Sequence, residues 1–183
     1  MLKVEEMLAY NKSFVEGKHY EEFSTSKYPD KKTLIISCMD TRLTELLPAA
    51  MNFKNGDIKI IKNSGAIISS PFGSVMRSVL VAIYELDVED IYVVGHYDCG
   101  VQGLNPERFI QKMLDKGIPK ERIDLAKYCG ININEWLRGF GSVEESVFDT
   151  MDCIMNHPFL PEGISVHGFI IDPETGRLDQ LSV

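Results

Sequence analysis

Residues 33–42 read TLIISCMDTR, a short and almost wholly apolar run that ends in a cysteine, an aspartate and an arginine. The apolar part, residues 33–37, has the length and the β-branched content of a buried strand. Further runs of the same character cover residues 58–61, 91–94 and 164–171. Strands that are apolar on both faces are typical of a parallel sheet covered by helices on both sides.

The segments between these strands show the apolar spacing of helices. Two of them carry clear start signals, because Asn105-Pro106 combines a capping side chain with a first-turn proline and Ser142-x-x-Glu145 is a capping box. Strands that alternate with helices predict an α/β fold. We expect helices over residues 4–15, from a Thr44 cap to Met51, from a Ser74 cap to Leu86, from Asn105 towards Gly117, around 122–127 and 134–137, and from Ser142 to about Met155.

Length and charge limit the kinds of protein that this chain can be. Its 183 residues predict a single domain over 1–183, in which residues 1–30 form an N-terminal helix and arm. The formal net charge of −8 argues against nucleic acid and against an anionic membrane surface as partners, since both need a basic face. Glu5 and Glu6 stand where a secretory signal needs an apolar core, so we expect a cytoplasmic protein whose four cysteines stay reduced.

Side chains that can bind a metal follow two of the predicted strands. Cys38 and Asp40 come directly after the first strand, and His96 and Cys99 follow the third. Parallel sheets form their sites beyond the carboxyl ends of the strands, so strands that deliver ligands to one place are expected to be neighbours. The second strand would then lie outside the first, in the local order 2-1-3. This arrangement predicts that Cys38, His96 and Cys99 converge.

Two thiolates and one imidazole are a donor set that suits Zn²⁺, and we expect one ion per chain. Three protein ligands leave a fourth position for water, which is the arrangement of a catalytic site. Zinc lowers the pKa of bound water to ~7. Asp40 has two possible roles: it is either a fourth ligand, or it pairs with Arg42 and accepts a hydrogen bond from the zinc-bound water.

Other polar or reactive residues have no comparable partner motif. Cys129 and Cys153 lie in helical segments and are expected to be buried core thiols. His167 lies in the fourth strand and is expected to be structural. Residues 62–66 are either a turn that needs glycine or a wall of the pocket. Asp98 is near enough in sequence to join a proton route, although a surface position is expected.

The motif pair Cys38-Met39-Asp40-Thr41-Arg42 and His96-Tyr97-Asp98-Cys99-Gly100 resembles the signature of the β-class carbonic anhydrases. Residues 54–63 resemble the second strand of that family. Val166-His167-Gly168 and residues 172–178 resemble its closing strands. The likeness runs from about residue 30 to the end of the sequence, and it is greatest for the small, archaeal-type branch.

The resemblance implies a parallel four-stranded sheet in the order 2-1-3-4, flanked by helices, with a fifth, antiparallel edge strand. It implies zinc on Cys38, His96 and Cys99, and a homodimer or higher homo-oligomer. Asp40 and Arg42 would form the catalytic dyad, and the Gly100 amide would donate to bicarbonate. The implied reaction is the reversible hydration of carbon dioxide to bicarbonate and a proton by zinc-bound hydroxide.

Some positions depart from the family's pattern. Pro29 stands where plant-type members carry a substrate-binding glutamine, so substrate anchoring cannot be copied from them. The apolar cleft positions of those members fall here on Lys59, Ser64 and Val81. Members with a non-catalytic bicarbonate pocket carry a tryptophan where this chain has Ile35. We therefore predict an open site in which Asp40 is bound to Arg42.

Two other functions fit the same motifs. The fold also hosts hydrolases of COS or CS₂ with the same ligands, and these substrates are linear and apolar like CO₂. A non-catalytic protein that binds zinc or bicarbonate is the second alternative. Loss of Asp40 or Arg42 would have favoured that second alternative, and both residues are present.

Overall fold

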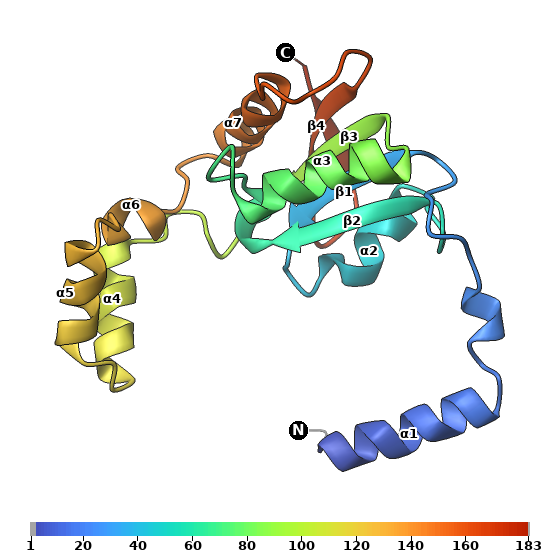
Figure 1. Ribbon diagram of the computed structural model, residues 1–183, viewed down its shortest axis with the longest axis horizontal. Helices are drawn as coiled ribbons and strands as arrows, with labels where there is room; N and C mark the ends of the chain where they lie inside the picture. The colour runs from blue at the N-terminus through green and yellow to red at the C-terminus, as the bar shows by residue number, and fades with distance from the viewer. Residues whose placement is uncertain (1–2, 183) are drawn as a thin grey trace.

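The strand β1 (Thr33–Cys38) is buried along its whole length in the computed structural model, which describes residues 3–182. It pairs in parallel with β2 (Ile58–Asn63) on one side and with β3 (Asp90–His96) on the other. β4 (Ser165–Ile171) continues the parallel sheet beside β3, and β5 (Leu178–Leu181) closes it as an antiparallel edge strand. The order β2-β1-β3-β4-β5 confirms the predicted topology (Figure 1).

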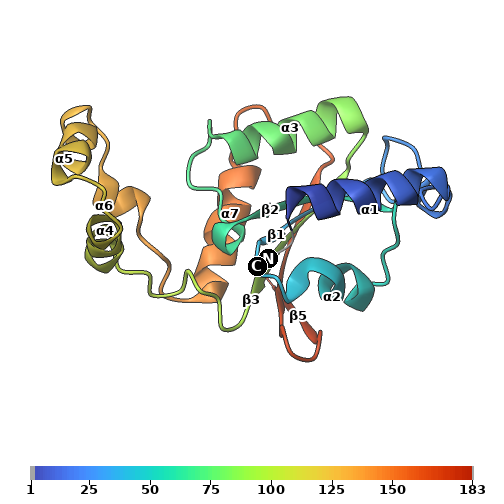
Figure 2. The same cartoon turned by 90° about the horizontal axis from the view of Figure 1, so that it is seen from below.

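Successive side chains of β1 point to opposite faces of the sheet, and both faces are covered by helices. Leu34 and Ile36 pack with α3 (Ser74–Leu86) and α7 (Val143–Met155) on one face. Ile35 packs with α2 (Leu43–Ala50) on the other. Figure 2 shows α2 and α3 on opposite sides of the sheet.

The predicted helices are present, and two of the predicted starts are slightly displaced. The Asn105 side chain caps α4 (Pro106–Asp115) by accepting from the Arg108 amide at 2.9 Å. Thr44 was expected to cap α2, but the helix begins one residue earlier, at Leu43, and the residue at its N-cap position is Arg42, which makes no side-chain capping bond. The Asp40 carboxylate accepts from the Arg42 amide at 2.9 Å, and the Asp40 carbonyl accepts from the Leu43 amide at 3.2 Å. In the same way Ser74 is the first residue of α3 rather than its cap.

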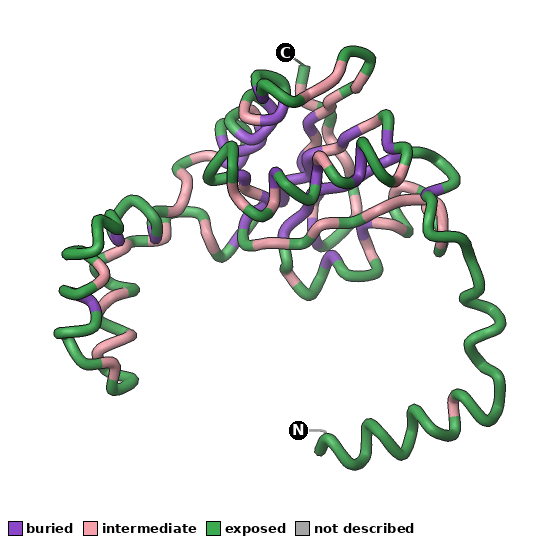
Figure 3. The backbone as a smooth tube through the Cα atoms, in the orientation of Figure 1, coloured by how far each residue is buried: buried purple, intermediate pink, exposed green. Residues whose placement is uncertain are grey.

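Two helical segments stand apart from the sheet in Figure 1. The first is the N-terminal arm, which contains α1 (Val4–Glu16) and the short η1 (Glu21–Phe23), and neither of these two helices has a buried residue (Figure 3). The second is the helical lobe, which we define as α4 with α5 (Lys120–Tyr128) and α6 (Ile133–Trp136) (Figure 1). Among the described residues no helix is long and apolar enough to span a membrane.

The helical lobe folds around a small core of its own, formed by Ile123, Ile133 and Leu137. This core is too small to cover every apolar side chain of the lobe. Cys129, at the end of α5, is exposed, so the expectation that it is a buried thiol was wrong. Cys153 on α7 is partly buried and packs against the core between the sheet and the helices α3 and α7.

Candidate metal centre

Three possible metal ligands meet where β1 and β3 end. Cys38 is the last residue of β1, His96 is the last residue of β3, and Cys99 follows in the next turn. All three are buried, and their ligand atoms lie within 4.8 Å of one another. The convergence that the strand order predicts is therefore present in the structure.

The spacing of the donors fits a tetrahedral zinc ion. The Sγ atoms of Cys38 and Cys99 are 3.8 Å apart. Two thiolates at ~2.3 Å from one tetrahedral zinc are about 3.8 Å apart, so these sulfurs need not move to share an ion. The observed distance is also far longer than the ~2.05 Å of a disulfide bond.

The imidazole of His96 is oriented for metal binding. Its Nδ1 lies 2.8 Å from the Tyr97 carbonyl oxygen, so Nδ1 carries the proton and Nε2 offers a lone pair. Nε2 is buried and has no hydrogen-bond partner among the described residues. Buried polar atoms are rarely left without a partner. A metal ion at this point would satisfy Nε2, and the donor set therefore fits zinc.

The protein also favours the thiolate form of one ligand. Burial alone would raise the pKa of the Cys38 thiol, but neighbouring His96 and the backbone amides of Gly65 and Asp40 outweigh burial and bring this pKa to about 7. The thiolate is the form that binds metal. At neutral pH a large share of Cys38 is therefore already thiolate before a metal ion binds. The Cys99 thiol differs, because burial raises its pKa.

The turn after β2 supplies the backbone beside Cys38. This turn is η2 (Ser64–Ala66), and Gly65 adopts the left-handed region with φ +80°. A Cβ atom on Gly65 would lie 2.9 Å from the Ile67 side chain and 3.2 Å from the Phe140 ring. The interpretation of residues 62–66 as a turn that needs glycine is therefore confirmed, and the Gly65 backbone also lies against the Cys38 thiol, whereas their role as a wall of the pocket stays a prediction.

Asp40 pairs with Arg42 in this structure, as the open-site prediction requires. Arg42 Nε donates to Asp40 Oδ1 at 3.0 Å, and Nη2 donates to Oδ2 at 2.9 Å. These bonds hold the pKa of the Asp40 carboxyl well below its usual range, at about 2. Asp40 Oδ2 nevertheless lies only 4.0 Å from His96 Nε2, next to the three donors.

Asp98 is the residue of this centre whose contact the sequence did not reveal. Its carboxylate accepts from Arg42 Nη1 at 3.0 Å, and its backbone carbonyl accepts from Nη2 at 3.1 Å. The Asp98 side chain is 84% exposed, so the expected surface position is confirmed, but the contact with Arg42 was missed. The available signal was its place between the two ligands His96 and Cys99, on the loop that follows β3.

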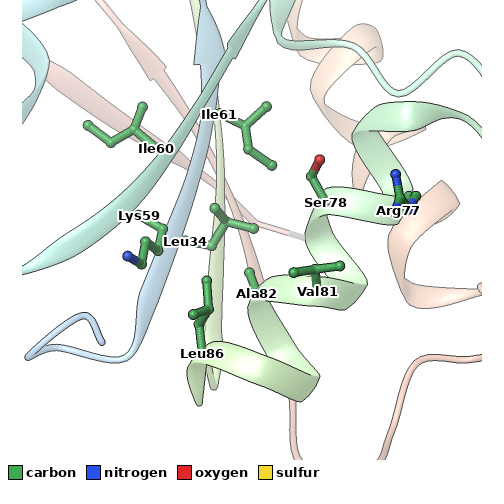
Figure 4. A pocket seen from close by; sticks show the side chains of 9 residues that line it. All are labelled: Leu34, Lys59, Ile60, Ile61, Arg77, Ser78, Val81, Ala82 and Leu86. Carbon is green, nitrogen blue, oxygen red and sulfur yellow. The ribbon is translucent and has the colours of Figure 1, made fainter. Parts of the chain in front are cut away.

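Gly100 is exposed and follows the ligand Cys99 directly. Apart from its two chain neighbours, no heavy atom of the described residues lies within 4 Å of the position that a Cβ would take on Gly100, so the space beside it is open. Lys59 and Val81, two of the positions that depart from the plant-type pattern, line a groove of about 420 Å³ between β2 and α3 (Figure 4). None of the three candidate metal ligands lines this groove. Ser64, the third position that departs from the plant-type pattern, is the first residue of η2.

Comparison with known proteins identifies relatives along almost the whole chain. Residues 33–178 match the family model described as carbonic anhydrase. The Bacillus subtilis protein YtiB, which is provisionally named a carbonic anhydrase, is 51% identical over 179 residues, covering 98% of this chain and 96% of that protein. The crystal structure of β-carbonic anhydrase isoform I from Trichomonas vaginalis has a TM-score of 0.88 at 30% identity, covering 98% of this chain and 97% of that one. A carbon disulfide hydrolase of Acidithiobacillus thiooxidans is 23% identical over 156 residues, which is 81% of this chain and 76% of that protein.

Proposed function

The chain belongs to the β-class of the carbonic anhydrase family, and we infer that it catalyses the reversible hydration of carbon dioxide at a zinc centre. One structural observation carries this function. The buried Nε2 of His96 has no hydrogen-bond partner within residues 3–182, and it lies with two cysteine sulfurs in a group of ligand atoms that are all within 4.8 Å of one another. Cys38, His96 and Cys99 would hold the ion. When bound, zinc acts as a Lewis acid that lowers the pKa of water, so that hydroxide is available near neutral pH.

The roles of the surrounding residues follow from their hydrogen bonds. Arg42 keeps Asp40 ionised, so Asp40 can only accept hydrogen bonds at neutral pH. We propose that it accepts one from the attacking oxygen and so turns a lone pair of that oxygen towards the carbon of CO₂. The Gly100 amide would then donate to bicarbonate, for which the open space beside this residue leaves room.

Hydrolysis of COS or CS₂ is not favoured as the alternative reaction. The carbon disulfide hydrolase is 23% identical to this chain, whereas a relative with a carbonic anhydrase name is 51% identical. A non-catalytic role is not favoured either, because Asp40 and Arg42 are both present and paired. Stopped-flow CO₂ hydration and a sulfide-release assay, run on protein of measured zinc content, test all three. Rapid hydration without sulfide release is expected, and full zinc with neither activity would contradict catalysis.

We further propose that the protein is a homodimer in which a second copy covers two surfaces. The first is α1, whose apolar side chains, including Val4, Leu8 and Val15, are exposed. The second is the groove between β2 and α3, where Ile60 and Val81 are also exposed (Figure 4). The first turn of α1 is acidic, and Lys59 and Arg77 line the groove, so the two surfaces have complementary charge.

Sedimentation velocity on two variants tests the dimer. Leu8→Glu on α1 and Val81→Glu in the groove should each shift the protein to monomers, because a buried charge would face the partner. Leu125→Glu on α5 is a matched control, since Leu125 is 60% exposed and Leu8 is 57% exposed. If both variants remained dimers, these surfaces would not form the interface.

We propose the cytoplasm as the compartment in which the protein works. Cys38 and Cys99 must remain free thiols to bind zinc, and a reducing compartment keeps them so. Fractionation of cells that express the full chain, followed by immunoblotting, should recover it with the cytoplasmic markers. Recovery outside that fraction would contradict the proposal.

A further inference from the structure

Arg42 is held by two aspartates that lie on two different loops of the metal centre. Its Nε and Nη2 donate to both oxygens of Asp40, which follows Cys38. Its Nη1 and Nη2 also donate to the carboxylate and the carbonyl of Asp98, which precedes Cys99. The guanidinium therefore ties together the two loops that follow β1 and β3, beside the three ligands.

The backbone of Asp98 suits this contact. Its φ of +55° lies in the left-handed region, which aspartate and asparagine adopt more readily than other residues with a side chain. An asparagine at this position would keep the backbone conformation and the carbonyl contact with Arg42, and it would remove only the carboxylate charge. Asp98→Asn is therefore a change that isolates the ion pair.

Asp40 is close enough to the ligands to become one itself. Its Oδ2 lies 4.0 Å from His96 Nε2, and a carboxylate oxygen is an ordinary zinc ligand. Both of its oxygens are engaged by Arg42 instead. We propose that Asp98 is a positioning residue: by anchoring Arg42, it keeps Asp40 off the metal and leaves the fourth position of the zinc open. This inference rests on the zinc centre of the proposed function.

The expected size of the effect follows from exposure. The side chain of Asp98 is 84% exposed and that of Arg42 is 37% exposed, and ion pairs of this kind contribute little to global stability. Loss of the Asp98 carboxylate should therefore leave the fold intact. It should shift the balance between Asp40 on Arg42 and Asp40 on the metal by up to about fivefold, which corresponds to about 1 kcal/mol.

Thiocyanate binding to the Co²⁺-substituted protein measures whether the fourth position is open. The anion binds there and changes the visible spectrum, and Asp40 on the metal would compete with it. Asp98→Asn should weaken thiocyanate binding by up to about fivefold. Asp87→Asn is the matched control, because Asp87 is exposed and also has a left-handed backbone, with φ +56°, but lies at the end of α3. Its thiocyanate affinity should equal that of the unchanged protein.

A double variant separates this mechanism from a general disturbance of the site. In an Asp40→Asn background, adding Asp98→Asn should no longer change thiocyanate affinity, because the competing carboxylate is gone. The inference is overturned if Asp98→Asn binds thiocyanate like the unchanged protein, or if its effect persists without Asp40. The spectrum does not depend on turnover, so absence of CO₂ hydration by the zinc protein would contradict the proposed function alone.

Discussion

The Sγ atoms of Cys38 and Cys99 lie 3.8 Å apart, although the two residues are 61 positions apart in the sequence. Only the parallel pairing of β1 with β3 brings them together, since Cys38 ends one strand and Cys99 follows the end of the other. The separation matches two sulfurs that share one zinc ion. The metal centre is thus a product of the sheet, and its ligands can be tested one by one.

Cys38→Ser should abolish tight zinc binding, because a serine hydroxyl is a poor zinc ligand. Without the Cys38 thiolate, only two protein donors remain. Metal analysis of the purified protein should fall from about one zinc per chain to well below one. Cys129→Ser, which changes an exposed thiol on the helical lobe, should keep its zinc. Full zinc in the Cys38 variant would contradict the assignment of this ligand.

Asp40→Asn should keep zinc and lose most of the CO₂ hydration rate. An asparagine amide is neutral, and only its oxygen can accept a hydrogen bond, so the attacking oxygen loses the charged acceptor that Arg42 holds in place. We expect kcat/KM to fall by about 100-fold, the scale of a lost acid–base group. Because the pKa of Asp40 is about 2, its own titration should not appear in the pH profile of the unchanged enzyme above about pH 4. An unchanged rate in the variant would refute this role.

Gly95→Ala should destabilise the junction of β3 and α7. The added Cβ would lie 2.7 Å from Val143 Cγ2 and 2.8 Å from Val147 Cγ2, so the helix must move away from the strand. Overpacking of this kind costs about 1–3 kcal/mol of unfolding free energy. Thermal unfolding should show a lower Tm, whereas Gly100→Ala, which meets no neighbour within 4 Å, should unfold near the original Tm. Equal Tm values for the two variants would contradict the packing argument.

Asp172 should contribute stability at neutral pH that is lost in acid. The backbone amides of Glu174 and Thr175 donate to its carboxylate at 2.8 and 3.0 Å, and they lower the pKa of Asp172 in the folded protein. A depressed folded pKa stabilises the protein above the unfolded value of about 3.9, and this contribution disappears as the pH falls through the folded pKa. Asp172→Asn should therefore lower Tm at pH 7 and have a smaller effect in acid.

Asp149→Asn, which changes an exposed aspartate of α7, is the control for the acid experiment. It should leave Tm close to that of the unchanged protein at both pH values. If Asp172→Asn lowered Tm equally at neutral and acid pH, the carboxylate would not be the source of the stability.

The local strand order 2-1-3 and the convergence of the ligands could be predicted from the residues because both follow from local patterns, whereas the places of the fourth and fifth strands came from the family resemblance. Apolar runs locate β1 and β3, and parallel strands must end at the same edge of a sheet. The contact between Arg42 and Asp98 could not be predicted in this way. It joins residues 56 positions apart and depends on a left-handed backbone in a loop, which no periodicity signals.

The exposure of Cys129 was missed for a related reason. Its helical surroundings resemble those of a core residue, but the helical lobe stands apart from the sheet and buries only a small core of its own. Helical spacing shows which residues share a face, and it does not show whether that face is covered. The interpretation of residues 1–183 as one domain stays a prediction.

The origin of the ligands in two different strands has a consequence for the order of folding. An unfolded chain holds Cys38 far from His96 and Cys99, so zinc is captured only after β1 has paired with β3. The rate of zinc release during slow denaturation, followed with a chromogenic chelator, would therefore measure how fast the sheet opens between β1 and β3. The metal would report when these two strands separate, independently of what happens in the N-terminal arm or the helical lobe.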